Sequence, residues 1–383
     1  MLTRYVRDES GAAARAALVY TAEEHPIRRQ DIDPDAVKIV RRLRRYGHSC
    51  YVVGGAVRDL LLGRSPKDFD LVTDAKPDEI RKLFRNSRII GKRFRLAHIF
   101  FREKTIEVST FRSLEAGTFH NVFGTIEEDA RRRDFSLNAL YFDPTEEQIV
   151  DFTGGFADIQ KKVLRPVIPL TQIFTEDPVR VIRGVKYAAT TGFRIPFMLR
   201  KRMRRDVPLL AGESTSRITE EVMKILGSGH SREILGALYR VGALKQILPN
   251  VADAYANREL KQAMETSLDT LDRLVAAQPD TQRSRMLVYL CADWFYRMAP
   301  EAKMDSVPQG DAFTRLKGFL QPITPPNREV ELALRHLIRR RKSYQRDGRL
   351  PLISDEPGSE RPRRRRSRGG RGRRGRALRI VRT

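Results

Sequence analysis

The feature that most constrains the fold of this chain is a pair of glycines between two periodic segments. The apolar run 51–53 predicts a short buried strand, and Gly54 and Gly55 follow it directly. The helical segment after them ends at Gly63, a residue type favoured just beyond a helix C-terminus. Glycines at such a turn let a polyphosphate approach the backbone N–H groups at the start of the helix. The segment therefore predicts a strand, a phosphate-binding turn and a helix.

Two carboxylates follow this helix on alternate positions of an apolar segment. In a strand, residues i and i+2 point to the same face, so Asp68 and Asp70 project together while Phe69 turns into a core. Two like charges this close repel each other unless a cation binds between them, and Mg²⁺ prefers oxygen ligands. An isolated Asp-x-Asp is more often part of a surface loop. Its combination with Gly-Gly-x-x-Arg-Asp favours metal-assisted phosphoryl or nucleotidyl transfer instead.

The net charge of the chain indicates a polyanionic partner. The 383 residues carry a formal charge of +25, and the twelve arginines of 361–383 account for a large part of it, leaving +13 elsewhere. A solvated basic surface explains some of this excess, but it does not explain why positive charges outnumber negative ones so strongly. We therefore expect a nucleic-acid partner. A membrane-surface protein would need an amphipathic or lipidated anchor, which we do not find, and we expect no membrane partner. Cys50 and Cys291 are too few for a disulfide framework or a zinc site, and we expect a soluble cytoplasmic protein.

Periodicity divides the chain into a mixed part and a helical part. Strand-like and helical segments alternate between residues 26 and 150, whereas residues 178–300 are mostly helical. Strands are expected at 51–53, 69–72, 88–90, 97–101 and 105–110, and helices at 33–46 and 77–84. From about residue 354 onward, Pro, Gly, Ser and Arg dominate, which is typical of disorder.

Further candidate site residues lie on two later segments. Glu107, within the predicted strand 105–110, would add a third carboxylate beside the Asp pair, and an exposed strand residue is an equally good explanation. In the segment 129–138, Arg133 and its neighbouring arginines would offer guanidinium groups to phosphates, and Asp134 a carboxylate to a ribose hydroxyl. A solvated helix start with internal ion pairs is the alternative for this segment.

A fourth segment, 176–183, contains the start of a helix. Pro178 suits the first helical turn and Asp177 suits the N-cap, with Arg180 one turn further on. Capping alone explains Asp177 without any ligand, and on the local pattern capping is the better interpretation.

In order and spacing, these segments resemble the bacterial poly(A) polymerase and tRNA CCA-adding enzyme family, the class II branch of the nucleotidyltransferase superfamily. The motifs are Gly-Gly-x-Val-Arg-Asp-x-Leu-Leu-Gly at 54–63, Asp-x-Asp at 68–70, Arg-Arg-Asp-Phe-Ser-Leu-Asn-Ala-Leu at 132–140 and Glu-Asp-Pro-Val-Arg at 176–180. The resemblance runs from about His25 to Tyr255. It implies an α+β fold: an N-terminal nucleotidyltransferase head with a small mixed β-sheet and helices, followed by an all-α neck and body and a disordered Arg-rich tail.

The resemblance also implies an activity and a domain order. The expected domains are a flexible leader at 1–25, the catalytic head at 26–165, a helical neck at 166–255 that binds the nucleotide base and RNA, a helical body at 256–350 and a disordered basic tail at 351–383. The expected reaction is template-independent addition of AMP from ATP to RNA 3′ ends, with release of pyrophosphate. The tail is expected to contact the RNA backbone.

Roles for individual residues follow from the same resemblance. Asp68 and Asp70 would bind two Mg²⁺ ions, with Mn²⁺ as an alternative, and Glu107 would be a third carboxylate of the catalytic centre. Asp134 is also expected to be a catalytic residue. Gly54, Gly55 and Arg58 would hold the triphosphate of the nucleotide, and Arg133, Asp134 and Asn138 would position its sugar and phosphates. Asp177 and Arg180 would bind the base. Arg183 is also expected to bind the nucleotide.

The base-reading pair does not separate two related activities. An Asp acceptor beside an Arg donor matches adenine and cytosine alike, so Asp177 and Arg180 suit poly(A) addition and CCA addition. The segments 91–98 and 121–130 and the basic tail favour poly(A) addition, and no His-Asp dipeptide of an appended phosphohydrolase domain occurs. The short segment 113–126 departs from typical poly(A) polymerases. CCA addition therefore stays the alternative, and a non-catalytic RNA-binding protein is a third hypothesis that the retained carboxylates disfavour.

Overall fold

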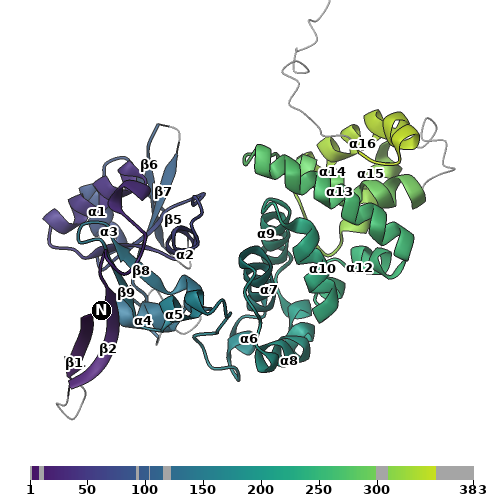
Figure 1. Ribbon diagram of the computed structural model, residues 1–383. Helices are drawn as coiled ribbons and strands as arrows, with labels where there is room; N and C mark the ends of the chain where they lie inside the picture. The colour runs from purple at the N-terminus through teal and green to yellow at the C-terminus, as the bar shows by residue number, and fades with distance from the viewer. Residues whose placement is uncertain are drawn as a thin grey trace, which may run out of the picture.

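The computed structural model describes residues 2–7, 13–91, 95–102, 104–114, 122–298 and 309–350. A strand-rich part is followed by a wholly helical part, and the two stand next to each other (Figure 1). They touch where Arg64 donates to the Thr190 carbonyl oxygen at 2.7 Å and Lys67 to the Pro279 carbonyl oxygen at 3.4 Å. The predicted α+β class is confirmed. The tail expected at 351–383 lies outside the described residues.

Nine strands among the described residues form one mixed sheet in the order β1-β2-β9-β8-β3-β4-β7-β6-β5. They are β1 (Leu2–Arg7), β2 (Ala13–Tyr20), β3 (Cys50–Val53), β4 (Asp70–Thr73), β5 (Ser87–Ile90), β6 (Leu96–Phe100), β7 (Thr105–Thr110), β8 (Leu140–Asp143) and β9 (Gln148–Asp151). Neighbouring strands are antiparallel except β4 and β7, which run parallel. The five strands predicted between residues 51 and 110 are present, each within one residue of the expected ends.

The described residues 2–7 and 13–20 differ from the flexible leader that the sequence predicts at 1–25. β1 and β2 form an antiparallel pair, and β2 continues the sheet by pairing Leu18 with Asp151 of β9. Without β2, the backbone N–H and C=O groups of β9 would form an open sheet edge, and the pairing satisfies them. Ala17 and Tyr20 are buried at this contact. The segment is therefore part of the sheet.

Strand alternation gives the sheet two apolar faces. In β3, Cys50 and Val52 point into the main core, whereas Tyr51 and Val53 join a smaller cluster on the opposite face. The main core also takes side chains from α1 (Pro34–Arg45), α2 (Gly55–Leu61), α3 (Pro77–Leu83) and α5 (Gly155–Gln160). The smaller cluster is covered by α4 (Ile126–Arg131) through Ala130. The two helices predicted at 33–46 and 77–84 are α1 and α3.

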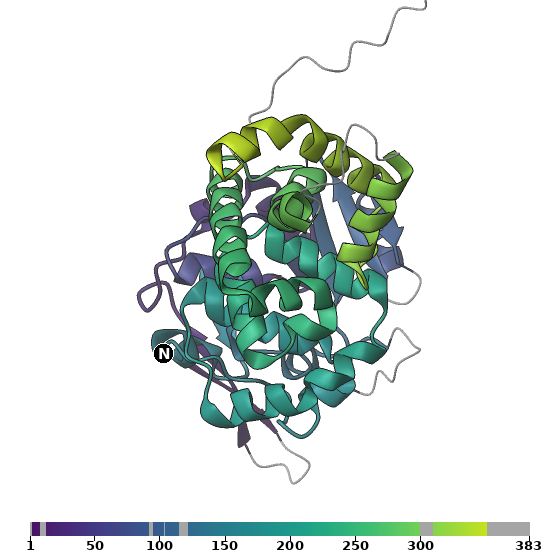
Figure 2. The ribbon, with the colours of Figure 1, turned by 90° about the vertical axis from the view of Figure 1, so that its right-hand side faces the viewer.

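The rest of the described chain is helical (Figure 2). Its helices are α6 (Ile173–Glu176), α7 (Val179–Thr191), α8 (Phe197–Asp206), α9 (Thr215–Leu226), α10 (Ser231–Val241), α11 (Leu244–Ile247), α12 (Pro249–Ala256), α13 (Arg258–Ala277), α14 (Arg283–Met298), α15 (Gln309–Leu320) and α16 (Asn327–Asp347). The short 3-10 helices are η1 (Arg29–Asp31), η2 (Ser136–Asn138) and η3 (Val207–Gly212). None of the described helices has both the length and the apolar character that crossing a bilayer requires.

Gly155 sets the distance between α5 and η2, the turn that carries Asn138. A Cβ atom at this position would lie 2.1 Å from the Ser136 carbonyl oxygen, which is backbone and cannot simply move aside. We expect Gly155→Ala to lower the free energy of unfolding by roughly 3 kcal/mol, because overpacking forces backbone shifts. Urea denaturation of the purified protein measures this loss.

The matched control is Gly212→Ala, at a position where no described heavy atom lies within 4 Å of the added Cβ. Its free energy of unfolding should change by no more than ~0.5 kcal/mol. Equal losses in the two variants would contradict the close approach at Gly155.

Candidate active site

The parallel register of β4 and β7 brings two carboxylates to the same end of the sheet. Leu71 pairs with Val108, so the residues directly before them, Asp70 and Glu107, lie side by side on neighbouring strands. Val72, two residues after Asp70, belongs to the smaller apolar cluster. Asp70 and Glu107 therefore lie on the face of the sheet that α4 covers.

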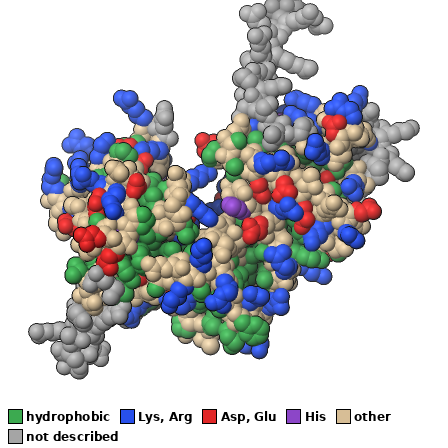
Figure 3. Space-filling view, in the orientation of Figure 1, with side chains coloured by type: hydrophobic (Ala, Val, Ile, Leu, Met, Phe, Trp, Pro, Cys, Tyr) green, Lys and Arg blue, Asp and Glu red, His purple; other side chains and the backbone are tan. Residues whose placement is uncertain are grey.

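A pocket of about 460 Å³ opens beside these carboxylates. Its volume falls within the range usual for small-molecule sites, about 300–1,000 Å³. Its charged lining consists of Asp70, Glu107, Asp129, Asp134, Asp177, Arg112, Arg132, Arg133, Arg180 and Arg183. In the space-filling view, Lys and Arg side chains reach into the hollow between the strand-rich part and the helical part (Figure 3).

The structure brings together most of the residues that the sequence proposes for a site. Those that line the pocket are Asp70, Glu107, Arg133, Asp134, Asn138, Asp177, Arg180 and Arg183, and those outside the described lining are Gly54, Gly55, Arg58 and Asp68. Gly54 starts α2 with a φ of +75°, a conformation that favours glycine. Arg58 reaches the pocket wall indirectly, because its Nη1 donates to Asn138 Oδ1 at 2.9 Å.

Asp70 has an environment unlike that of a free carboxylate. Asp68 precedes β4 in an irregular segment, so the predicted strand alternation of the pair does not extend to it, while Phe69 packs against the main core as predicted. Asp70 keeps contact with solvent. Even so, partial burial, the charge of Glu107 and the charge of Asp68 together raise its pKa to about 6.

Carboxylates that repel one another in this way form a donor set that suits a hard divalent cation. Asp70 and Glu107 offer their oxygens at the pocket wall, and Asp68 lies close enough to act on Asp70 electrostatically. Glu107 Oε1 also lies 3.3 Å from Nε2 of His98 on β6. In the described part of the chain, no group of three or more Asp, Glu, His or Cys side chains is already arranged to hold a metal ion.

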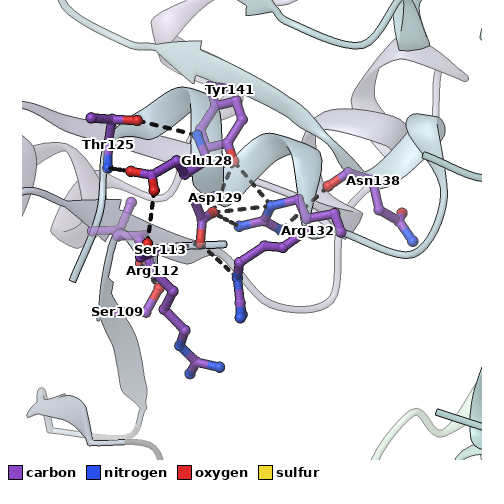
Figure 4. A network of polar contacts seen from close by, with 11 residues as sticks. Ser109, Arg112, Ser113, Thr125, Glu128, Asp129, Arg132, Asn138 and Tyr141 are labelled. Atoms are coloured by element: carbon purple, nitrogen blue, oxygen red, sulfur yellow. Dashed lines mark hydrogen bonds and ion pairs between the residues drawn. The ribbon is translucent and has the colours of Figure 1, made fainter. Parts of the chain in front are cut away.

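Guanidinium groups face these carboxylates from the end of α4. The buried Asp129 holds two of them, with Nη2 of Arg133 at 2.8 Å and Nε of Arg132 at 3.3 Å (Figure 4). Burial and the positive charge of Arg132 lower the pKa of Arg112 to about 10. Guanidinium groups gathered in this way suit the oxygens of a polyphosphate.

Asp134 joins this wall to the helical part. Its Oδ1 accepts a hydrogen bond from the Phe135 N–H at 2.8 Å, and its Oδ2 lies 2.9 Å from Nε of Arg183 on α7. Arg183 in turn donates to the Tyr187 hydroxyl group at 3.1 Å. Because Asp134 directly follows Arg133, this ion pair fixes α7 relative to the arginine wall.

The start of α7 carries the proposed base-reading pair. Asp177 Oδ1 accepts from the Val179 N–H at 3.1 Å, so the capping interaction that the sequence favours is present. Both Asp177 oxygens also accept from Nη2 of Arg217 on α9, each at 2.9 Å. Arg180 Nη1 donates to Glu176 Oε2 at 3.0 Å. Capping and base reading do not exclude each other, because the carboxylate and guanidinium groups also face the pocket.

Comparisons with known proteins agree with this arrangement. A family model described as "Poly A polymerase head domain" matches residues 50–165, and one described as "Probable RNA and SrmB-binding site of polymerase A" matches residues 192–255. The chain is 34% identical to poly(A) polymerase I of Salmonella typhi over 326 residues, which covers 79% of this chain and 70% of that relative. The chain belongs to the poly(A) polymerase and CCA-adding nucleotidyltransferase family. The resemblance seen in the sequence is confirmed.

Other relatives of this nucleotidyltransferase are CCA-adding enzymes. The chain is 36% identical to the CCA-adding enzyme of Geobacillus thermodenitrificans over 227 residues, 57% of this chain and 55% of that enzyme. Its fold is similar to that of the Bacillus stearothermophilus CCA-adding enzyme in complex with CTP, with a TM-score of 0.51, 23% identity and coverage of 82% of this chain and 100% of that one. At this identity the likeness supports the fold alone.

A larger hollow of about 840 Å³ lies between α10 and α13. Its charged groups largely satisfy one another: Arg232 Nη1 pairs with Asp269 Oδ2 at 2.7 Å, and Asp272 accepts from the Ser231 N–H at 2.7 Å. These contacts hold α10 against α13. The smaller pocket beside Asp70 is therefore the candidate active site.

Several pocket residues have no predicted role in the sequence. Arg112, Ser109 and Asp129 line the pocket, and Arg217 holds Asp177 from another helix. Asp129 carries a local signal, because an acid three or four residues before an arginine on a helix favours an ion pair. Arg112 and Arg217 lie outside every motif, and only the tertiary structure brings them to the site. Parts of the segments 91–98 and 113–126 lie outside the described residues.

The raised pKa of Asp70 predicts an effect of pH on stability. Its pKa exceeds the ordinary value of 3.8, so the folded protein binds this proton more tightly than the unfolded chain does. The contribution of Asp70 to the stability of the metal-free protein should therefore fall as the pH rises from about 4 through about 6. Asp70→Asn has no charge at this position, so it should be more stable than the wild type above about pH 7 and match it below about pH 4.

Urea denaturation in the presence of a chelator, repeated across this pH range, provides the measurement. Parallel pH profiles for wild type and Asp70→Asn would contradict the crowding of carboxylates at this position.

Proposed function

We propose that this nucleotidyltransferase is a poly(A) polymerase, which adds AMP from ATP to RNA 3′ ends and releases pyrophosphate. The geometric support is a single pocket in which carboxylates on neighbouring strands face arginines from α7 and from the segment directly after α4. Carboxylates suit metal ions and arginines suit phosphates, and nucleotidyl transfer requires both on opposite sides of the reacting phosphate. The choice of poly(A) addition rests on the extent of similarity, 79% of the chain for poly(A) polymerase I and 57% for a CCA-adding enzyme.

The reaction divides between the two walls of the pocket. Divalent metal ions, Mg²⁺ in the first instance, would be held by Asp70 and Glu107 with Asp68 beside them, and when bound they supply charge neutralisation and an activated hydroxyl group. The RNA 3′-hydroxyl attacks the α-phosphate of ATP in line. Arg133 and Arg132 bind the phosphates of ATP, including those that leave as pyrophosphate.

Asp177 and Arg180 read the base in this proposal. A carboxylate accepts from the adenine amino group, and a guanidinium group donates to the adjacent ring nitrogen. Arg217 holds both oxygens of Asp177 at 2.9 Å, so the acceptor has a fixed direction. Asp134 lies between base and phosphate sites, where it accepts from a ribose hydroxyl. The arginines of 361–383 bind the RNA backbone without regard to sequence.

CCA addition is the second candidate. Cytosine presents the same donor and acceptor pair as adenine, so Asp177 and Arg180 serve both activities. The 36% identity to a CCA-adding enzyme over 227 residues supports this alternative.

A gel of reaction products separates the two activities. The protein is incubated with Mg²⁺ and one nucleoside triphosphate at a time, on an unstructured RNA and on a tRNA that lacks its terminal CCA. We expect a long ladder with ATP on both primers and little extension with CTP. If only the tRNA is extended, and extension stops after two C and one A when both nucleotides are supplied, the assigned activity would be CCA addition instead of poly(A) addition.

Asp70→Ala tests the catalytic assignment. We expect it to abolish nucleotide addition, with a loss of at least about 1,000-fold, because electrostatic stabilisation of the reacting groups depends on this carboxylate. The fold should persist, since Asp70 is an exposed residue of the pocket wall at the start of β4. Asp78→Ala, which removes an exposed carboxylate from the first turn of α3, is the control and should keep normal activity. A normal rate in Asp70→Ala would refute the assignment.

A further inference from the structure

We propose that Tyr141 is a positioning residue for nucleotide addition, because its buried hydroxyl group fixes the Arg133 guanidinium that faces the nucleotide phosphates. The inference rests on the proposed function in one respect, the assignment of Arg133 to those phosphates. Tyr141 itself is not part of the described pocket lining, so it would act only through Arg133.

Tyr141 reaches the site from inside the sheet. It lies on β8, is fully buried and belongs to the smaller apolar cluster below α4. Its ring packs edge-on against Tyr51 and Phe111, with centroids 6.3 and 6.5 Å apart. A phenylalanine would fill this space equally well, so packing does not explain the hydroxyl group, which is costly to bury unless it is hydrogen-bonded.

The hydroxyl group of Tyr141 lies between a carboxylate and a guanidinium group. It donates to Asp129 Oδ2 at 2.8 Å and accepts from Nε of Arg133 at 3.1 Å (Figure 4). The same Asp129 oxygen accepts from Arg133 Nη2 at 2.8 Å, and the Asn138 carbonyl oxygen accepts from Arg133 Nη1 at 3.3 Å. The guanidinium group is therefore held on three of its nitrogen atoms.

These contacts leave part of the guanidinium group available to a ligand. An arginine side chain has five N–H groups, and Arg133 directs three of them at described partners. One N–H on each terminal nitrogen remains, and Arg133 lines the pocket. Two such N–H groups suit the oxygens of a phosphate. Their direction is set by how firmly the other side of the group is held.

The charges in this network keep each partner in the required protonation state. Although burial opposes ionisation of Asp129, the charges of Arg133 and Arg132 hold its pKa below the ordinary value. Burial raises the pKa of the Tyr141 hydroxyl group, so it stays protonated and can donate. Asp129 is thus a fixed acceptor for both Tyr141 and Arg133.

Tyr141→Phe tests the role of the hydroxyl group. We expect the Kd for ATP, measured without primer, to rise about tenfold, which corresponds to roughly 1.4 kcal/mol. The KM for ATP should rise by a similar factor, with kcat changed much less, because the loss falls on phosphate binding. The matched control is Tyr255→Phe, which removes another buried hydroxyl group that has no hydrogen-bond partner among the described residues. Its Kd should equal that of the wild type.

A double-mutant cycle with Arg133→Ala separates positioning from general stability. If Tyr141 acts through Arg133, Tyr141→Phe should cause no further loss of ATP affinity in the Arg133→Ala background. A tenfold loss that persists there, or an unchanged Kd in Tyr141→Phe alone, would overturn the proposal. Asp129→Asn provides a second variant, and it should raise the KM for ATP at least as much.

Different experiments test the role of Tyr141 and the choice between poly(A) and CCA addition. The product gel decides between ATP and CTP as substrates, whereas the binding comparison depends on phosphates that both nucleotides share. If the enzyme proves to be CCA-adding, the same variants are compared with CTP and the expected ratios stay the same.

Discussion

The parallel pairing of β4 with β7 is the contact on which the rest of the site depends. It is the one parallel pair in a sheet whose other described neighbours are antiparallel, and it places Asp70, the first residue of β4, beside Glu107 of β7. Like charges in neighbouring positions are unfavourable without a cation, and together with burial they raise the pKa of Asp70. A sheet built for stability alone would separate them, so this arrangement indicates a site that binds positive charge.

The opposite wall of the pocket brings positive charges close together. Arg112, Arg132 and Arg133 lie close together near the end of α4, and their mutual repulsion is offset by the buried Asp129. Because Asp129 neutralises only part of this charge, the wall keeps a net attraction for anions. Polar groups that are fully hydrogen-bonded can be buried and rigid, and the hydroxyl group of Tyr141 adds to this rigidity. The carboxylates and the arginines then face each other across one pocket.

Much of the fold follows from local patterns in the sequence. Asp33 caps α1 as its place before Pro34 suggests, the apolar run 51–53 forms β3, and Gly54 has the positive φ that its turn requires. The sequence does not predict the strands β1 and β2, because they are held mainly by backbone pairing, β1 with β2 and β2 with β9, and this pairing needs no particular side-chain pattern. Alternation correctly predicts that Phe69 packs against the core, but the strand that it predicts for both carboxylates begins only at Asp70, and Asp68 lies before it.

The sequence by itself determined the family, the α+β class and the set of charged residues available for chemistry, because motif order and periodicity are properties of the chain. Only the tertiary structure decided which charges meet. Asp70 and Glu107 become neighbours through the register of two strands, and Arg217 reaches Asp177 through the packing of α9 against α7. Tyr141 carries no signal in the sequence at all. Its proposed role depends on the contacts of its hydroxyl group with Asp129 and Arg133, and these contacts depend on the distance between β8 and α4.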